Sequence, residues 1–271
     1  MTAVRDDRSA FVRHVEPVMG TAVSFELRAP LPVPGTLGRA IDWLHHVDAT
    51  FSTHRIDSEI SRLALGEIRV DDLGEQTREI LGRCVALEAR TNGAFDAFSV
   101  PAPNGTRLDP SGLVKGWSIE VAAGILESGG ATNFTVNAGG DIVFRGERAP
   151  GRAWRAGIRH PDDPELQARV LEIHGPVGLA TSGQYERGVH IIDPRTPMGP
   201  MELAGATVIG PDLGDADAFA TAIFVMGLDG LDWIEDQDGY EAFLITFDRR
   251  TCWSSGFEAM TARRDRPVAR E

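Results

Sequence analysis

The sequence predicts an α+β domain in which helices flank a mainly antiparallel sheet. Apolar residues at helical spacing gather in the first half of the chain, whereas short segments rich in β-branched residues dominate the second half. A regular alternation of strand and helix, which a doubly wound nucleotide-binding fold requires, is missing. Helices and strands are therefore partly segregated along the chain.

The first expected element is a strand within residues 12–27. Val23, Phe25 and Leu27 recur there with the two-residue period of a half-buried strand. The proline-rich loop that begins at Pro30 ends this strand, because proline removes a backbone donor from the ladder.

Three helices are expected next. Apolar residues recur at helical spacing through 37–51 and again through 80–87, where an Asn-Gly pair stops the second helix. A third pattern passes through 114–125 and closes at a pair of glycines, with Lys115 expected at the opening of this helix.

The second half of the chain predicts a sheet and one more helix. The helix covers about 215–226, with Asp215 as its N-terminal cap and Gly227 as its stop. The expected strands are 133–137, 141–145, 153–159, 168–174, 178–181, 188–193 and 203–210, followed by a closing hairpin of 240–247 and 252–257.

The chain is expected to form one domain over residues 15–258, with an N-terminal extension over 1–14 and a loose C-terminal tail over 259–271. Its 271 residues, 42% of them hydrophobic, can bury a substantial core. No stretch approaches the roughly 18 consecutive apolar residues of a membrane helix, and no secretion signal is recognised. We therefore expect no membrane span and a cytoplasmic location.

Charge and cysteine content exclude several classes of function. The net charge of -13 repels phosphate backbones, so nucleic-acid binding is not expected. A phosphate-bearing ligand would need a bound cation, a helix N-terminus or backbone N–H groups beside it. Cys84 and Cys252 stand in no zinc or redox spacing, and both are interpreted as packing residues.

Asp217 and Thr221 form the most suggestive pair for metal binding. They are four residues apart in the last expected helix, so their side chains share one face. A carboxylate with a hydroxyl suits Mg²⁺, which prefers hard oxygen ligands and keeps substrate phosphates in its shell. An Asp placed favourably for the helix dipole and a Thr in the core explain the pair equally simply, and the spacing alone favours that structural explanation.

Several short segments carry polar groups that suit a phosphate or flavin ligand. The glycine-rich turn over 137–141 permits a close backbone approach, although a hairpin turn explains it as well. Lys115 is placed to reach a phosphate, and His190 to act as a base near neutral pH, although each is more often structural. Two further segments are Ala94-Phe95-Asp96, which follows a helix stop, and Thr181-Ser182-Gly183, which ends an apolar strand.

The order of these motifs along the chain resembles the ApbE family of FAD:protein FMN transferases. The resemblance covers about residues 15–227. The matching strings are MGT at 19–21, FSTHR at 51–55, GAFD at 93–96, LVKG at 113–116, NAGGD at 137–141, ATSGQYER at 180–187, HIIDPRT at 190–196 and DADAFATAIFVMG at 215–227.

The resemblance implies a T-fold-like single domain that binds FAD as substrate, with its diphosphate on Mg²⁺. A Thr or Ser hydroxyl in a short motif of an acceptor flavoprotein would attack the FMN phosphorus and release AMP. Asp217, Thr221 and the backbone carbonyl of Val114 are the implied metal ligands, and Asp217 and Lys115 would also serve catalysis. No acceptor motif is found in this chain, so the acceptor is expected to be another protein in the cytoplasm.

The resemblance also implies the remaining site residues. His190 would take the proton of the attacking hydroxyl. Lys115 and the segment Thr181-Ser182-Gly183 would lie near the phosphates. The implied flavin and adenine contacts and phosphate neighbours are Met19, His54, Ala94, Phe95, Asp96, Ser111, Lys115, Trp117, Thr181, Ser182, Gly183 and Ile191.

Three departures from the family pattern bear on specificity. The family usually has Tyr where His54 stands, which weakens any ring stacking there. Ser111 and Val114 replace residues of the usual GGIAKG string but leave the lysine in place. Pro197-Met198 interrupts the usual DPRTG string and would reshape the substrate loop.

Two alternatives to protein flavinylation stay open from the sequence. If water were the acceptor, the protein would be an FAD pyrophosphatase that yields FMN and AMP. If turnover had been lost, it would be a non-catalytic flavin-binding protein.

Overall fold

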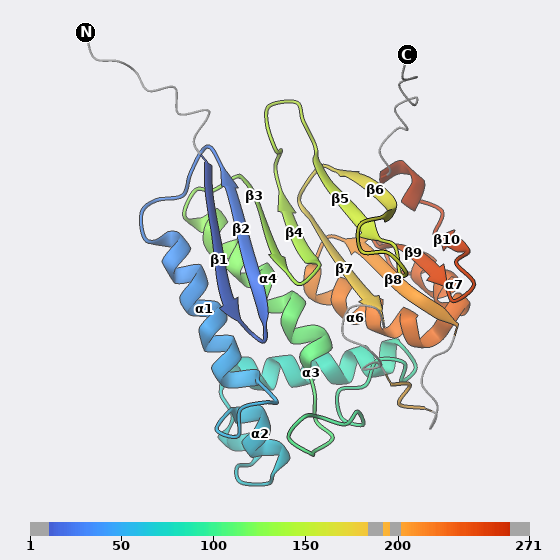
Figure 1. The fold of residues 1–271 in the computed structure, drawn as a ribbon. Helices are drawn as coiled ribbons and strands as arrows, with labels where there is room; N and C mark the ends of the chain where they lie inside the picture. Colours follow the sequence, from blue (N-terminus) through green and yellow to red (C-terminus); the bar gives the residue numbers. More distant parts are fainter. Residues whose placement is uncertain (1–10, 184–191, 196–201, 261–271) are drawn as a thin grey trace, which may run out of the picture.

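The computed structural model describes residues 11–183, 192–195 and 202–260, and it places helices on one face of a large antiparallel sheet (Figure 1). The eight-stranded sheet has the order β1-β2-β3-β4-β7-β8-β9-β10. Its strands are β1 Phe11–Val18, β2 Thr21–Arg28, β3 Asn133–Ala138, β4 Asp141–Arg145, β7 Val177–Gly183, β8 Leu203–Gly210, β9 Glu241–Thr246 and β10 Thr251–Trp253. The expected α+β class with a mainly antiparallel sheet is confirmed.

The helices form the main core with one face of this sheet. Their apolar stripes meet Val23, Phe25 and Leu27 of β2, the residues whose alternation predicted a strand. The helices are α1 Thr36–Phe51, α2 Glu59–Ala64, α3 Glu75–Arg90, α4 Ser111–Ser128, α6 Leu213–Met226 and α7 Gly230–Glu235.

A second, smaller sheet covers part of the opposite face. Strands β5 (Trp154–Arg159) and β6 (Gln167–Ile173) pair antiparallel and bury their apolar side against β4, β7, β8 and β9. The strict alternation of buried and exposed residues along β5 reflects this one-sided burial.

The N-terminal region and the last helix differ from expectation. Residues 11–28 form two strands, because Met19 and Gly20 adopt positive φ angles of 55° and 68° and turn the chain back on itself. Strand β1 thus begins ahead of residue 15, the expected start of the domain. Helix α6 begins at Leu213, and its cap is Asp212, whose carboxylate accepts the backbone N–H of Asp215. Asp215 as the cap was therefore wrong, whereas Gly227 as the stop is confirmed.

Smaller differences concern element lengths. Helix α4 begins at Ser111, one turn before Lys115, so the lysine does not open the helix. β10 ends at Trp253, and the expected strand over 252–257 gives way to a 3-10 turn at Phe257. The short helices α2 and α7 were not predicted. Of the expected strand at 188–193, residues 188–191 lie outside the described part of the chain, and residues 192–193 form no strand.

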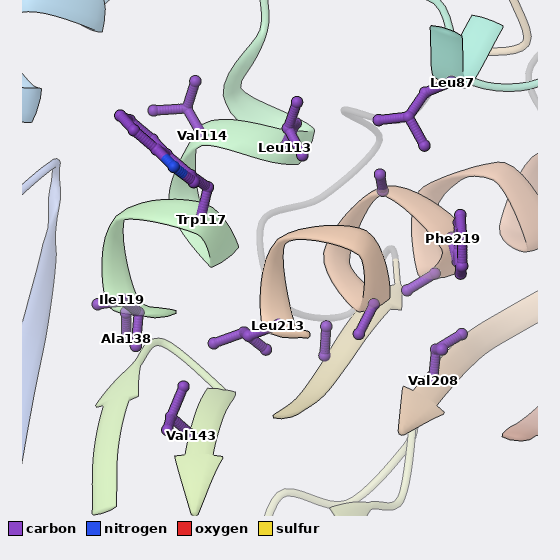
Figure 2. Close-up of a cluster of buried hydrophobic side chains, with 14 of the residues drawn as sticks. Leu87, Leu113, Val114, Trp117, Ile119, Ala138, Val143, Val208, Leu213 and Phe219 are labelled. Atoms are coloured by element: carbon purple, nitrogen blue, oxygen red, sulfur yellow. The ribbon is translucent and has the colours of Figure 1, made fainter. Parts of the chain in front are cut away.

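Helices α4 and α6 touch at a glycine, and this contact sets the position of the candidate site. A Cβ at Gly116 would lie 2.4 Å from the Leu213 carbonyl oxygen and 2.9 Å from the Asp217 Cβ. Figure 2 shows Leu213 at the start of α6, beside α4 and above Val143 of the sheet. The two backbones can approach this closely only because Gly116 has no side chain.

A buried ionic network joins the same two helices to the sheet. Arg145 of β4 is 6% exposed and pairs with Glu120 and Glu127 of α4. The other Glu120 oxygen accepts the Leu213 backbone N–H at 3.2 Å, at the first turn of α6. Burial raises the pKa of Glu120, against the opposing effect of Arg145.

Two findings bear on the remaining expectations. Within the described ranges, no helix is long and apolar enough to cross a membrane. Cys84 is fully buried in the core, and burial raises its pKa to about 12, in keeping with a packing role.

Replacing Gly116 by alanine is expected to lower the free energy of unfolding by about 1–3 kcal/mol, because the new Cβ forces α4 away from α6. Gly124 of the same helix has open space around it, so Gly124→Ala should raise stability by about 0.5–1 kcal/mol. Chemical denaturation of both variants measures the difference. A wild-type midpoint for Gly116→Ala would contradict the tight contact.

Glu120→Gln is expected to alter how stability depends on pH. Since the folded-state pKa of Glu120 lies above the usual 4.5, the folded state holds its proton more tightly than the unfolded chain. The wild type should therefore lose stability relative to Glu120→Gln as pH rises from 4.5 through the raised pKa. Urea unfolding of both proteins over that range measures the effect, and a constant difference would refute it.

Candidate active site

Segments distant in the sequence converge where the first turns of α4 meet α6. Lys115 and Gly116 come from α4, Asp217 from α6, and Asp141 from the start of β4, directly after the β3–β4 turn. The end of β7 adds Ser182, whose hydroxyl lies near α6. The structure therefore brings together the expected metal pair, the expected lysine and the polar strand end.

Asp217 lies against the backbone of α4. Its side chain is 4% exposed, and one carboxylate oxygen accepts the Gly116 N–H at 3.0 Å. The absence of a side chain at Gly116 is what lets the carboxylate reach this N–H. Asp217 is thus held in one orientation by a backbone donor.

Lys115 is held between two buried carboxylates. Its ammonium forms an ion pair with Asp141, whose side chain is 1% exposed, and lies 3.7 Å from the Asp217 Oδ1. The other Asp141 oxygen accepts the Thr181 N–H at 3.1 Å. The lysine therefore balances much of the negative charge that two buried acids create.

Asp141 was missed as a site residue by the sequence analysis. The NAGGD string marked it only as the end of a glycine-rich turn, and the structure confirms a turn, with φ angles of 61° at Gly139 and 104° at Gly140. The only signal in the sequence was an acid directly after two glycines. Its burial and its pairing with Lys115 depend on the tertiary structure, because Lys115 is distant in the sequence.

Thr221 lies one helical turn after Asp217 and meets the end of β7. Its hydroxyl oxygen is 3.2 Å from that of Ser182. The neighbouring Thr181 hydroxyl bonds to Thr207 of β8 at 3.0 Å, and Gly183, the last residue of β7, is buried. The strand end thus presents its hydroxyl groups to α6 and the adjacent strand.

The expected flavin-contact segment lies beside this pair. Ala94 and Phe95 are buried, and Asp96 is half-buried. A Cβ at Gly112 would lie 3.3 Å from the Phe95 ring and 3.4 Å from the Thr221 hydroxyl oxygen. Gly112, which the sequence analysis did not single out, therefore leaves room for the ring and the hydroxyl at the start of α4.

Met19 contacts the turn of α4 after Lys115, whereas Trp117 packs in the core. The Met19 sulfur, in the β1–β2 turn, lies 3.5 Å from the Ser118 hydroxyl, which donates to the Lys115 carbonyl at 2.8 Å. Trp117 is buried among the helices, edge-on to Trp43 with ring centroids 5.2 Å apart. Trp117 therefore contributes mainly to the core in the described structure.

The remaining expected residues are peripheral or undescribed. His54 and Ser111 are both exposed; the His54 N–H bonds to the Ser52 hydroxyl and the Ser111 N–H to Asp109. His190 and Ile191 lie outside the described residues. Their roles stay predictions.

The donor set at α6 fits a hard divalent cation better than a soft one. Among the residues that the structure describes, no group of three or more His, Cys, Asp or Glu side chains surrounds a metal-sized space. Asp217 and Thr221 instead offer carboxylate and hydroxyl oxygens one turn apart, and Val114 lies one residue before Lys115 in α4. A site with only a few protein oxygen donors suits Mg²⁺, because Mg²⁺ usually completes its coordination shell with substrate phosphates and water.

Comparison with known proteins shows relatives in sequence. An FAD:protein FMN transferase of Vibrio cholerae serotype O1 is 28% identical over 78% of this chain and 80% of that protein. The FAD:protein FMN transferase of Salmonella typhimurium is 33% identical, but over 51% of this chain and 42% of the relative. The chain thus matches less than half the length of the Salmonella protein.

Solved structures show the same fold. The flavin transferase ApbE from Vibrio cholerae superposes with a TM-score of 0.80 and 26% identity, over 93% of this chain and 99% of that chain. The apbe protein from Thermotoga maritima gives a TM-score of 0.79 at 21% identity, which shows similarity of fold.

The sequence pattern of the ApbE family matches residues 19–102 and 99–244, which contain every described residue of the Lys115–Asp141–Asp217 cluster. On this match and the shared fold, the chain belongs to the ApbE family.

Proposed function

We propose that this protein transfers FMN from FAD to a Thr or Ser hydroxyl of a target protein, with Mg²⁺ at Asp217 and Thr221. The observation that carries the proposal is the convergence of Asp217, Thr221 and Lys115 at the α4–α6 contact. It supports the proposal because phosphoryl chemistry needs cations beside the transferred group, and this chain has a net charge of -13.

The charges of the cluster suit a diphosphate ligand. A bound Mg²⁺ would neutralise phosphate oxygens and stabilise charge on the bridging oxygen during the reaction. Lys115 presents a second positive charge from α4, and Asp141 fixes its ammonium near the carboxylate of Asp217. The Phe95 ring is buried beside Gly112, close to Thr221, and so helps to shape this part of the site.

The proposed step is a displacement at phosphorus. The acceptor oxygen forms a bond to the FMN phosphorus, the bond from that phosphorus to the bridging oxygen breaks, and AMP leaves with the bridging oxygen. The hydroxyl proton passes to a base, and family resemblance proposes His190 for that task. Lys115 would hold the diphosphate in line for attack.

The acceptor is proposed to be a separate flavoprotein, because this chain holds no acceptor string of the family type. The cytoplasmic location expected from the sequence stays part of the proposal. Fractionation of cells followed by detection of this protein and of covalently bound FMN in the same compartment tests it.

Asp217→Ala is expected to lower FMN transfer by about 100-fold or more, because it removes the oriented metal ligand. The purified protein is incubated with FAD, Mg²⁺ and a peptide that carries the family acceptor motif, and AMP release and peptide mass are followed. Asp215→Asn is the matched control on the same helix, since Asp215 pairs with Arg83, and it should stay within about threefold of wild type.

The products separate the alternatives in that assay. AMP release with an FMN-sized gain in peptide mass supports transfer, whereas AMP release without a mass gain supports a pyrophosphatase. Bound FAD without AMP release supports a non-catalytic flavin binder. Equal activity of Asp217→Ala and wild type would refute the metal site.

Asp141→Asn is expected to weaken FAD use through its effect on Lys115. Lys115→Met should lower kcat/KM for FAD by about tenfold or more, and Asp141→Asn by a smaller factor. If Asp141 acts by placing the ammonium, the double variant should be no worse than Lys115→Met alone. If the loss of kcat/KM in the double variant equals the product of the two single losses, Asp141 acts independently of Lys115.

A further inference from the structure

An open groove of about 500 Å³ runs along the face of the large sheet that points away from the helices. Its floor is built from β1 to β4, and one wall comes from β5 and the connection that precedes it. Strands β5 and β6 bury their apolar side against β4 and the strands beyond it, whereas β1, β2 and β3 contribute nothing to that core among the described residues. The N-terminal half of this sheet face is therefore accessible in the described structure.

The floor consists of two rows of directly paired residues. Cross-strand partners in an antiparallel sheet point to the same face, so each row presents its side chains together. The first row is Val15, Ser24, Asn137 and Ile142, and the second is Arg13, Glu26, Thr135 and Phe144. All eight line the groove.

The wall is held rigidly against this floor. Trp154 of β5 is 4% exposed, and its indole N–H donates to the Arg145 carbonyl at 2.9 Å. This bond fixes the start of β5 to the end of β4. Arg148 and Arg155, on either side of this anchor, are exposed and line the groove.

The groove is cationic on a strongly acidic protein. Arg13, Arg148 and Arg155 line it, and Glu26 is its one acidic lining residue in the described structure. Burial acts to raise the pKa of Glu26, but its hydrogen bonds with Arg28 and Arg13 and their charges together lower it. Glu26 offsets Arg13, so Arg148 and Arg155 supply the positive charge of the groove, and on a chain with a net charge of -13 they favour an anionic partner.

One end of the groove lies next to the candidate active site. In the first floor row, the pair Asn137–Ile142 is next in the ladder to Ala138–Asp141, the pair that closes the β3–β4 turn. Asp141 holds Lys115 on the helical side of that turn. At the same end of the sheet, the β1–β2 turn brings Met19 to Ser118, in the turn of α4 after Lys115.

We propose that this groove binds an extended, acidic segment of the acceptor protein and leads its hydroxyl residue over the β3–β4 turn to the site at Lys115. This inference rests on the proposed transfer to a protein. A nucleic acid fits less well, because a chain of -13 repels a long phosphate backbone while a short acidic segment meets mainly the local arginines.

The test uses two fluorescent peptides that share the acceptor motif and differ only in an extension of Glu or of Gln at either end. Binding is followed by fluorescence polarisation, and FMN transfer by mass. Wild type should bind the Glu peptide about tenfold more tightly than the Gln peptide at low salt, with the difference shrinking as salt rises. Arg148→Glu/Arg155→Glu should abolish that preference.

Arg159→Glu is the matched control. Arg159 is exposed on β5 four residues after Arg155, but it does not line the groove, so this variant should keep the preference for the Glu peptide. FAD affinity should be unchanged in all variants, which shows that the site at Lys115 is intact.

Three outcomes would overturn the docking groove: equal binding of both peptides by wild type, an equal loss in Arg159→Glu, or a wild-type dimer that Arg148→Glu/Arg155→Glu converts to a monomer. Preferential binding of the Glu peptide without any FMN transfer would support the groove and contradict the proposed transfer. The two proposals therefore fail in distinguishable ways.

Discussion

The close contact of α4 with α6 at Gly116 is the constraint on which the rest of the site depends. The missing side chain lets the Leu213 carbonyl and the Asp217 carboxylate reach the α4 backbone. The same contact sets the distance between Lys115 and Asp217, since these residues sit on facing turns. The network of Glu120 with Arg145 and the Leu213 N–H secures the contact from the sheet side. The contact at Gly116 thus sets both the packing of α4 on α6 and the spacing of the charged side chains.

Opposite charges balance one another at the candidate site. A buried acid is unfavourable unless it is paired and hydrogen-bonded, and Asp141 and Asp217 meet this requirement through Lys115 and backbone N–H groups. The arrangement leaves a lysine and a carboxylate–hydroxyl pair beside each other without large net charge. This balance suits the proposed uptake of a cation together with a diphosphate, because each would offset the charge of the other.

The two faces of the large sheet differ in what they contact. One face packs on the helices and places the β3–β4 turn against Lys115. The other face carries the arginine-lined groove over β1 to β4, and both reach the same turn. Asp141, the first residue of β4 after this turn, therefore lies between the buried ion pair with Lys115 and the groove residue Ile142. This placement is possible because alternate residues of a strand point to opposite faces.

The sequence by itself determined the α+β class, most strand positions, the four helices α1, α3, α4 and α6, and the Asp217–Thr221 spacing, because periodicity and the one-turn relation are local properties. The sequence did not predict the hairpin at Met19, the Asp212 cap or the role of Asp141. A positive φ at a non-glycine residue and a charge partner on another element leave little local signal. Only the tertiary structure decided that Lys115 lies between Asp141 and Asp217, since that depends on how α4, α6 and the β3–β4 turn pack, with Gly116 allowing the approach.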